Sequence, residues 1–243
     1  MLLLGPILRR LLVMLVVLAI PVVIVELVAR KLIGAAVASA VRARIGVAPK
    51  IGFGSTPLLL QLVGGKLDTV TASATGARID GLPPLTLSAT LRDVHMTHLT
   101  SLEGAIGSLN VVATLSPAAV AGLLATPSCV ASLPASGLAA LTRRPRVALF
   151  PGRVDLLPPH GRAVELRFRP AVAANSVEFA LSGFERGGSA VPAAELASAV
   201  TRAHCSRALT NLPFGIALDS ATARSGALDL GFHGANASFS AIG

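Results

Sequence analysis

The sequence contains no tryptophan and no tyrosine, and only eight phenylalanines in 243 residues. Aromatic side chains stack on nucleic-acid bases, so their scarcity argues against a nucleic-acid partner despite the formal net charge of +9. Acidic residues are also few, 12 against 21 lysines and arginines. Hydrophobic residues nevertheless make up 53% of the sequence, which excludes a disordered chain.

The hydrophobic residues are mainly alanine, valine and leucine. A large domain normally fills its core with bulky side chains, at a density close to that of organic crystals. The composition therefore predicts a thin core, several thin cores, or an internal space that another molecule fills.

No motif in the sequence indicates catalysis. The G-x-S-x-G nucleophile elbow, the H-E-x-x-H motif and a phosphate-binding glycine loop are all missing. His95 and His98 come closest to a metal-ligand pair, but residues three apart on a strand face opposite sides. We therefore expect no metal and no cofactor, and we assign no catalytic residue.

The N-terminal region contains a continuous apolar segment. Arg9 and Arg10 are followed by Leu11–Val25, fifteen residues without a charge. This length fits the hydrophobic region of a signal peptide and falls short of the ~20 residues of a typical membrane span. Ala38-Ser39-Ala40 resembles a cleavage site but lies beyond several charged residues. An uncleaved signal anchor is therefore favoured over a cleaved signal peptide for residues 1–25, followed by one domain over residues 26–243.

The two cysteines and the basic residues give opposite indications of compartment. Cys129 and Cys205 are the only cysteines, and an even number in an exported chain is typical of a disulfide; two unrelated buried thiols are the alternative. Five basic residues between Arg30 and Lys50 argue against export of that flank by the positive-inside rule. We give the cysteines more weight and predict a single-pass cell-membrane protein with an extracytoplasmic domain.

Basic residues concentrate in two regions, residues 26–66 and 143–169. Each region is either a solvated face or a surface that attracts anionic lipid headgroups. Near such a membrane, each basic residue contributes about 1 kcal/mol to the attraction. An anionic membrane surface is therefore a predicted partner.

Sequence periodicity predicts the secondary structure. Residues 26–45 are helix formers whose few polar side chains share no face, so this helix is expected to be buried around most of its circumference. Alternating polar and apolar residues then predict half-buried antiparallel strands, and Ser116-Pro117 and Pro192 each begin a predicted helix. The strands are predicted over residues 69–75, 85–92, 107–115, 164–169, 177–181, 215–224 and 227–233. Together these elements predict an α+β fold in which one extended antiparallel sheet curls round the long N-terminal helix.

One stretch resembles a known family. Residues 40–74 read AVRARIGVAPKIGFGSTPLLLQLVGGKLDTVTASA, and residues 81–96 read GLPPLTLSATLRDVHM. Both resemble the LmeA-like phospholipid-binding proteins of actinobacterial cell envelopes, and the resemblance continues more thinly over Leu212–Phe239. Where that family has Pro-Phe-Leu, this chain has Pro57-Leu58-Leu59.

The resemblance implies a tubular lipid-binding-like fold, a place in the envelope and a role in lipoglycan maintenance. Phospholipid is the implied ligand, held or transferred in an apolar groove, and a phospholipase A-type hydrolase and a purely structural envelope module are the alternatives. Small inner residues would leave room for acyl chains, each methylene contributing about 0.8 kcal/mol on burial. Pro57–Val63 is either an apolar turn near the groove or bilayer, or a cap packed in the core. The predicted lipid-binding residues are Arg42, Arg44, Phe53, Pro57, Leu58, Leu60, Leu85, Leu87 and Leu91.

Overall fold

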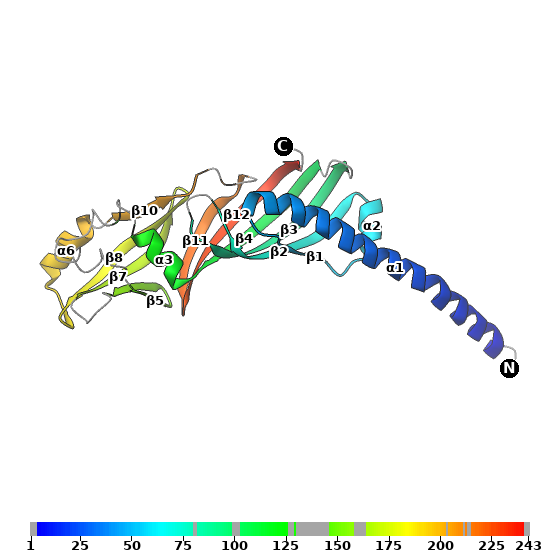
Figure 1. Cartoon of the computed structure of the whole chain (residues 1–243), viewed down its shortest axis with the longest axis horizontal. Helices are drawn as coiled ribbons and strands as arrows, with labels where there is room; N and C mark the ends of the chain where they lie inside the picture. Colours follow the sequence, from blue (N-terminus) through cyan, green and yellow to red (C-terminus); the bar gives the residue numbers. More distant parts are fainter. Residues whose placement is uncertain are drawn as a thin grey trace.

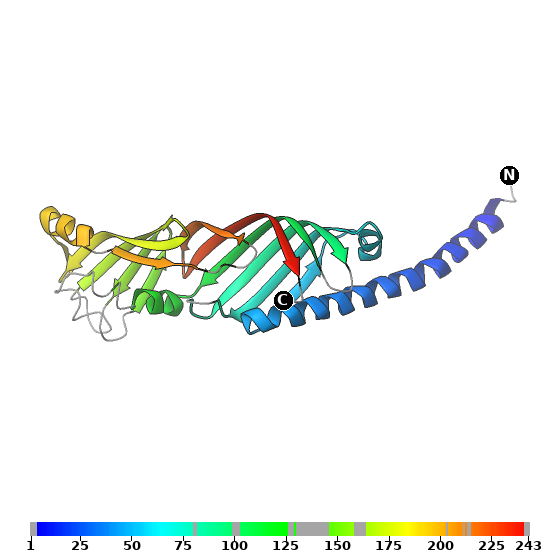
Figure 2. The same ribbon diagram turned by 90° about the horizontal axis from the view of Figure 1, so that it is seen from above.

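The protein is an elongated molecule in which two antiparallel sheets lie end to end and a long helix extends from one end (Figures 1 and 2). This computed structural model describes residues 4–79, 82–98, 103–125, 129, 146–157, 164–202, 204–210, 212 and 215–240. Within the N-terminal helix, side chains are described from Val23 onward, except those of Ala40 and Arg44. The predicted α+β class and antiparallel strands are confirmed, but the strands form two open sheets rather than one.

Helix α1 (Leu4–Ile45) joins what the sequence suggested were two separate units, the apolar segment and the helix of residues 26–45. It ends where predicted, at Ile45, and is followed by Gly46, whose positive φ of 76° places it in the left-handed region that glycine adopts without strain. Among the residues whose side chains are described, no helix is long and apolar enough to span a membrane. Most of the apolar segment Leu11–Val25 lies outside those residues.

Burial of α1 is confined to one side, so the prediction of a helix buried around most of its circumference is wrong. The partly buried positions recur every three or four residues, which defines a single stripe along the helix. Sheet packing covers only that stripe, because the sheet lies along α1 without enclosing it (Figure 2). The stripe includes Glu26, Ala29, Arg30, Ile33, Val37 and Val41.

Sheet A has six strands in the order β1-β2-β3-β4-β12-β11. The C-terminal strand therefore pairs with β4, far from it in sequence. Strand β12 continues past the predicted end at residue 233 because it pairs along the whole length of β4. The strands are β1 (Lys50–Phe53), β2 (Lys66–Ala77), β3 (Leu85–His98), β4 (Glu103–Leu115), β11 (Ala217–Arg224) and β12 (Ala227–Ser240). A short helix, α2 (Leu58–Val63), connects β1 to β2.

Sheet B has the order β10-β8-β7-β6-β5, with β9 paired to β8. Its core is conventional, since Phe168, Phe179 and Phe184 are all buried. The strands are β5 (Arg146–Phe150), β6 (Arg153–Leu157), β7 (Val164–Ala173), β8 (Ser176–Arg186), β9 (Ser189–Ala190) and β10 (His204–Ala208). Among the described residues, helices α3 (Pro117–Leu124) and α6 (Ala193–Arg202) accompany this half of the molecule, each beginning close to its predicted proline.

Strand β11 forms the junction between the two sheets. The amide of Gly152, in the turn between β5 and β6, donates to the carbonyl of Ala223 on β11 at 2.8 Å. The amide of Leu218 on β11 donates to the side-chain oxygen of Asn175, in the turn between β7 and β8, at 2.9 Å. These bonds attach the turns of sheet B directly to the edge of sheet A.

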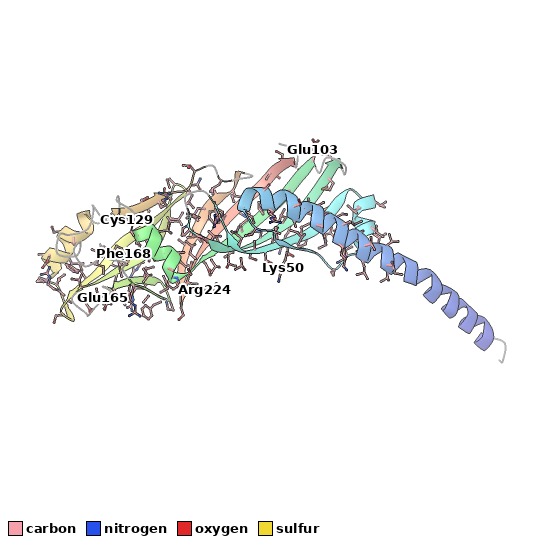
Figure 3. The ribbon with its side chains drawn as sticks, viewed as in Figure 1. Lys50, Glu103, Cys129, Glu165, Phe168 and Arg224 are labelled. Atoms are coloured by element: carbon pink, nitrogen blue, oxygen red, sulfur yellow. A yellow bond between two sulfur atoms is a disulfide. The ribbon has the colours of Figure 1, made fainter. Side chains whose placement is uncertain are left out.

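A disulfide joins Cys129 to Cys205, the bridge predicted from the sequence, with 4.5 Å between the two Cα atoms. It connects the segment after α3 to β10 of sheet B, and Figure 3 shows Cys129 beside that sheet. Apart from Cys129, residues 126–145 lie outside the described residues.

Candidate functional site

The face of sheet A that packs against α1 is called here the inner face. A Cβ atom added at Gly34 of α1 would lie 3.8 Å from the ring of Phe53 and 3.9 Å from Cβ of Ile51. Residues opposite each other in an antiparallel pair share a face, and Phe53 and Ile51 are opposite Val70 and Ala72 on β2. The inner face therefore continues from β1 across β2 and into the centre of the sheet.

Small and branched apolar residues make up the centre of the inner face. Phe232 is the only aromatic residue in the three central cross-strand rows, so this face carries little bulk. The opposite face of β2 and β3 is polar, because serines and threonines alternate with the apolar residues, as the sequence predicts; on β4 the same face includes the exposed Val112. The three rows, from β2 to β12, are Ala74–Leu87–Ala113–Leu230, Ala72–Ala89–Val111–Phe232 and Val70–Leu91–Leu109–Gly234.

The centre of β3 is the least covered part of this face. Leu87, Ala89 and Leu91 are only partly buried, whereas Leu85 and Val94 on the same strand are 3% and 4% exposed. The thin core expected from the composition is therefore located on sheet A, where the protein's own side chains incompletely cover an apolar surface.

Helix α2 is attached to α1 through a carboxylate. Glu26 of α1 accepts hydrogen bonds from the backbone amides of Leu58 and Leu59, at 2.5 and 2.9 Å, and so satisfies two of the free N–H groups at the start of α2. Arg30 donates to Glu26 at 2.6 Å and to the carbonyl of Thr56 at 3.1 Å. The amide of Leu59, aided by Arg30 and the amide of Leu58, lowers the pKa of Glu26, so this carboxyl is ionised at neutral pH.

The polar residue of α2 points inward. Gln61 is buried at 7% exposure, donates to the carbonyl of Thr56 at 2.8 Å and accepts from the amide of Asp68 at 2.7 Å. Leu60 and Val63, in contrast, are 68% and 90% exposed. Helix α2 is thus apolar on its solvent-facing side.

The predicted lipid-binding residues fall into three groups, on β3, around α2 and on α1. Leu85, Leu87 and Leu91 lie on β3, where Leu85 belongs to the closed core and the other two belong to the uncovered centre.

The second group surrounds α2. Leu58 is completely buried, Pro57 and Leu60 are exposed, and Phe53 lies partly buried against α1. Of the two interpretations of the Pro57–Val63 stretch, Leu58 fits a packed cap and Leu60 fits an apolar surface.

The two predicted arginines lie on α1. Arg42 is exposed, and the side chain of Arg44 lies outside the described residues.

Sequence reasoning missed Glu26 and Gln61. The available signals were a lone acid directly after the apolar segment and a lone polar residue within LLLQLV. Neither signal identifies a partner, because Glu26 contacts backbone that follows it by 32 residues.

Ion pairs neutralise part of the basic excess. Lys66 lies 2.8 Å from Asp93, and this pairing raises the pKa of Lys66 and lowers that of Asp93. In the region of residues 143–169, Arg153 lies 2.9 Å from Asp155, and Arg167 lies within 3.1 Å of both Glu165 and Glu185.

Lys31, Arg42 and Lys50, in contrast, remain exposed on and near α1. The basic charge that stays accessible in the first region is therefore on the side of the molecule that carries the long helix. Within the described part of the chain, no group of three or more His, Cys, Asp or Glu residues is placed to hold a metal ion.

Sheet A thus presents a small-residue, partly uncovered apolar face beside a long helix (Figure 2), a surface of a size and chemistry that suits an elongated apolar ligand. The model of the LmeA-like phospholipid-binding family matches residues 24–233, so the chain belongs to that family. The resemblance noted in the sequence is confirmed, and phospholipid is the ligand class that the family indicates. Comparisons with curated proteins and with solved structures gave no match.

Proposed function

We propose that the protein holds a phospholipid with its acyl chains along the uncovered centre of the inner face, between β3 and α1. The observation that carries the proposal is the partial exposure of Leu87, Ala89 and Leu91 on a face where the nearby Val70, Ala74, Leu109 and Ala113 are buried. Acyl chains would complete this core, since burial of each methylene contributes about 0.8 kcal/mol. In this arrangement sheet A and α1 together enclose the chains, as in tubular lipid-binding domains.

We also propose that residues 1–25 anchor the protein in the cell membrane, with the two sheets on the extracytoplasmic side. The Cys129–Cys205 disulfide supports this location, because disulfides persist in oxidising compartments. Holding or transferring phospholipid there, in support of lipoglycan maintenance, is the role that we assign to the protein.

The test uses the full-length protein in its own membrane. A diazirine-bearing amino acid is incorporated at position 87, on the inner face, or at position 88, the exposed neighbour on the opposite face. After illumination, mass spectrometry should find a phospholipid adduct at position 87 and little or none at position 88. Equal adducts at both positions, or none at position 87, would refute the proposed binding surface.

The same protein distinguishes binding from hydrolysis. Incubated with phospholipid vesicles, a binding or transfer protein should leave the lipids intact. Release of fatty acid and lysophospholipid in proportion to protein would instead establish the phospholipase A-type alternative.

A further inference from the structure

Exposed apolar side chains gather at one end of the molecule. Of the ten large hydrophobic side chains that are exposed among the described residues, eight lie on α1 and α2; the other two are Val112 and Phe150. Figures 1 and 2 place α2 beside α1 where that helix leaves sheet A. We call this surface the apolar tip; it consists of Val23, Ile24, Val25, Leu27, Val28, Leu32, Leu60 and Val63.

Helix α2 turns its only polar residue, Gln61, inward beside the buried Leu58 and exposes the apolar Leu60 and Val63, whereas a surface helix in water exposes its polar residues. Its buried Gln61 is satisfied by Thr56 and Asp68, so a polar side chain occupies the inward position at no loss of hydrogen bonds. Leu60 and Val63 then face outward. This reversal is expected of an element whose outer face contacts an apolar medium rather than water.

Glu26 fixes the position of that outer face. Its carboxylate binds both Leu58 and Leu59, and Arg30 holds Glu26 and the chain before α2 together. Leu60 and Val63 are therefore held at a constant position relative to α1. The two helices present their exposed apolar side chains as one unit.

We propose that the apolar tip inserts into the surface of a phospholipid bilayer, with α2 acting as a wedge at the boundary between headgroups and acyl chains. We choose the bilayer as the medium that covers the tip because the tip continues an apolar segment. The uncharged residues Leu11–Val25 belong to the same helix and end within the tip. Charge agrees with this choice, since the exposed Lys31 lies within the tip's stretch of α1 and suits anionic headgroups. The choice of phospholipid rests on the proposed function.

Insertion of the tip would also orient the protein. Sheet A begins at the tip, so its inner face would start at the membrane, and a lipid leaving the bilayer would meet α2 before it reached the centre of β3. Sheet B would point away from the membrane (Figure 1).

The experiment exploits the native cysteines, which are both in the disulfide, so that an introduced cysteine provides a single reactive thiol. Full-length Val63→Cys is labelled with the environment-sensitive dye NBD and reconstituted into vesicles of phosphatidylcholine and phosphatidylglycerol. Val112→Cys, an exposed valine on β4 outside the tip, is the matched control. Lipids with doxyl groups on the acyl chains should quench the dye at position 63 at least threefold more than the dye at position 112. Iodide in the aqueous phase should instead quench the dye at position 112 more than the dye at position 63.

Equal quenching at the two positions by doxyl lipid, or equal access of iodide, would overturn the proposal. The proposal would also be overturned if the dye at position 63 is protected from iodide, is not quenched by doxyl lipid, and becomes more protected as protein density rises. That result would show that the tip contacts a second copy of the protein. Photocrosslinking at position 87 gives an independent readout. Lipid adducts at position 87 without quenching at position 63 would agree with the proposed function and would contradict only the insertion of α2 into the bilayer.

Discussion

Replacement of Leu87 by tryptophan tests whether the centre of the inner face belongs to the protein core or to a ligand. Leu87 lies between Ala74 and Ala113 on the neighbouring strands and is only partly buried. A larger side chain there would extend into the incompletely covered space. Leu85→Trp is the matched control, because Leu85 lies two residues away on the same face of the same strand but is 3% exposed.

The two substitutions should have different thermodynamic effects. Overpacking a closed core costs about 1–3 kcal/mol, which for a chain of this size lowers Tm by roughly 2–12 °C, so Leu85→Trp should fall in that range. Leu87→Trp should lower Tm of the lipid-free protein by less than about 2 °C. If its indole displaces about two acyl methylenes, lipid binding should weaken by about 1.6 kcal/mol, roughly fifteenfold.

Both quantities can be measured on the same delipidated preparation, Tm by circular dichroism and affinity by titration with a fluorescent phospholipid. A large fall in Tm for Leu87→Trp with unchanged lipid affinity would show that this site is ordinary core. That result would refute the assignment of the acyl chains to the centre of β3.

Two further predictions concern the contacts that hold the fold together. The Cys129–Cys205 bridge spans 76 residues, so the double serine variant should lose about 4 kcal/mol in the chain-entropy model, seen as a fall in Tm of roughly 8–16 °C; an unchanged Tm would contradict it. Because the pKa of Glu26 is lowered in the folded state, its ionised form stabilises the fold above the ordinary glutamate pKa of about 4.3, and this is lost as pH falls through the lowered value. Glu26→Gln should therefore be less stable than wild type at pH 7 and converge with it in acid, with faster hydrogen exchange at Leu58 and Leu59; a difference that stays constant with pH would refute the role of the charge.

The local elements of the fold could be predicted because the signals for them are local. The strands around residues 69–75 and 85–92 follow from period-two alternation, which depends only on the direction of successive side chains along an extended chain. Ser116 was likewise predictable as a helix cap, and its hydroxyl accepts from the amide of Ala119 at 3.3 Å. The disulfide followed from the number of cysteines and the expected compartment.

The arrangement of these elements was decided by long-range contacts. Alternation shows that β4 and β12 each have an apolar side, but not that they pair with each other across more than a hundred residues, nor that the strands divide into two sheets. For the same reason the one-sided burial of α1 was not predictable. Its sequence indicates an apolar helix, but the fraction of its circumference that is buried depends on where sheet A ends.

The candidate site shows the same division on a smaller scale. Leu58 and Leu60 are identical residues two positions apart, yet one is completely buried and the other is 68% exposed. The sequence left open whether Pro57–Val63 is an apolar turn near the groove or bilayer or a cap packed in the core, because its orientation depends on Glu26, whose carboxylate approaches from another helix. By itself the sequence determined the longer strands, the helices that begin near Pro117 and Pro192 and the small size of the apolar residues, but not the short strands β1, β5, β6, β9 and β10. The tertiary structure decided which apolar surfaces remain uncovered, because exposure depends on every element packed nearby and not on the residue alone.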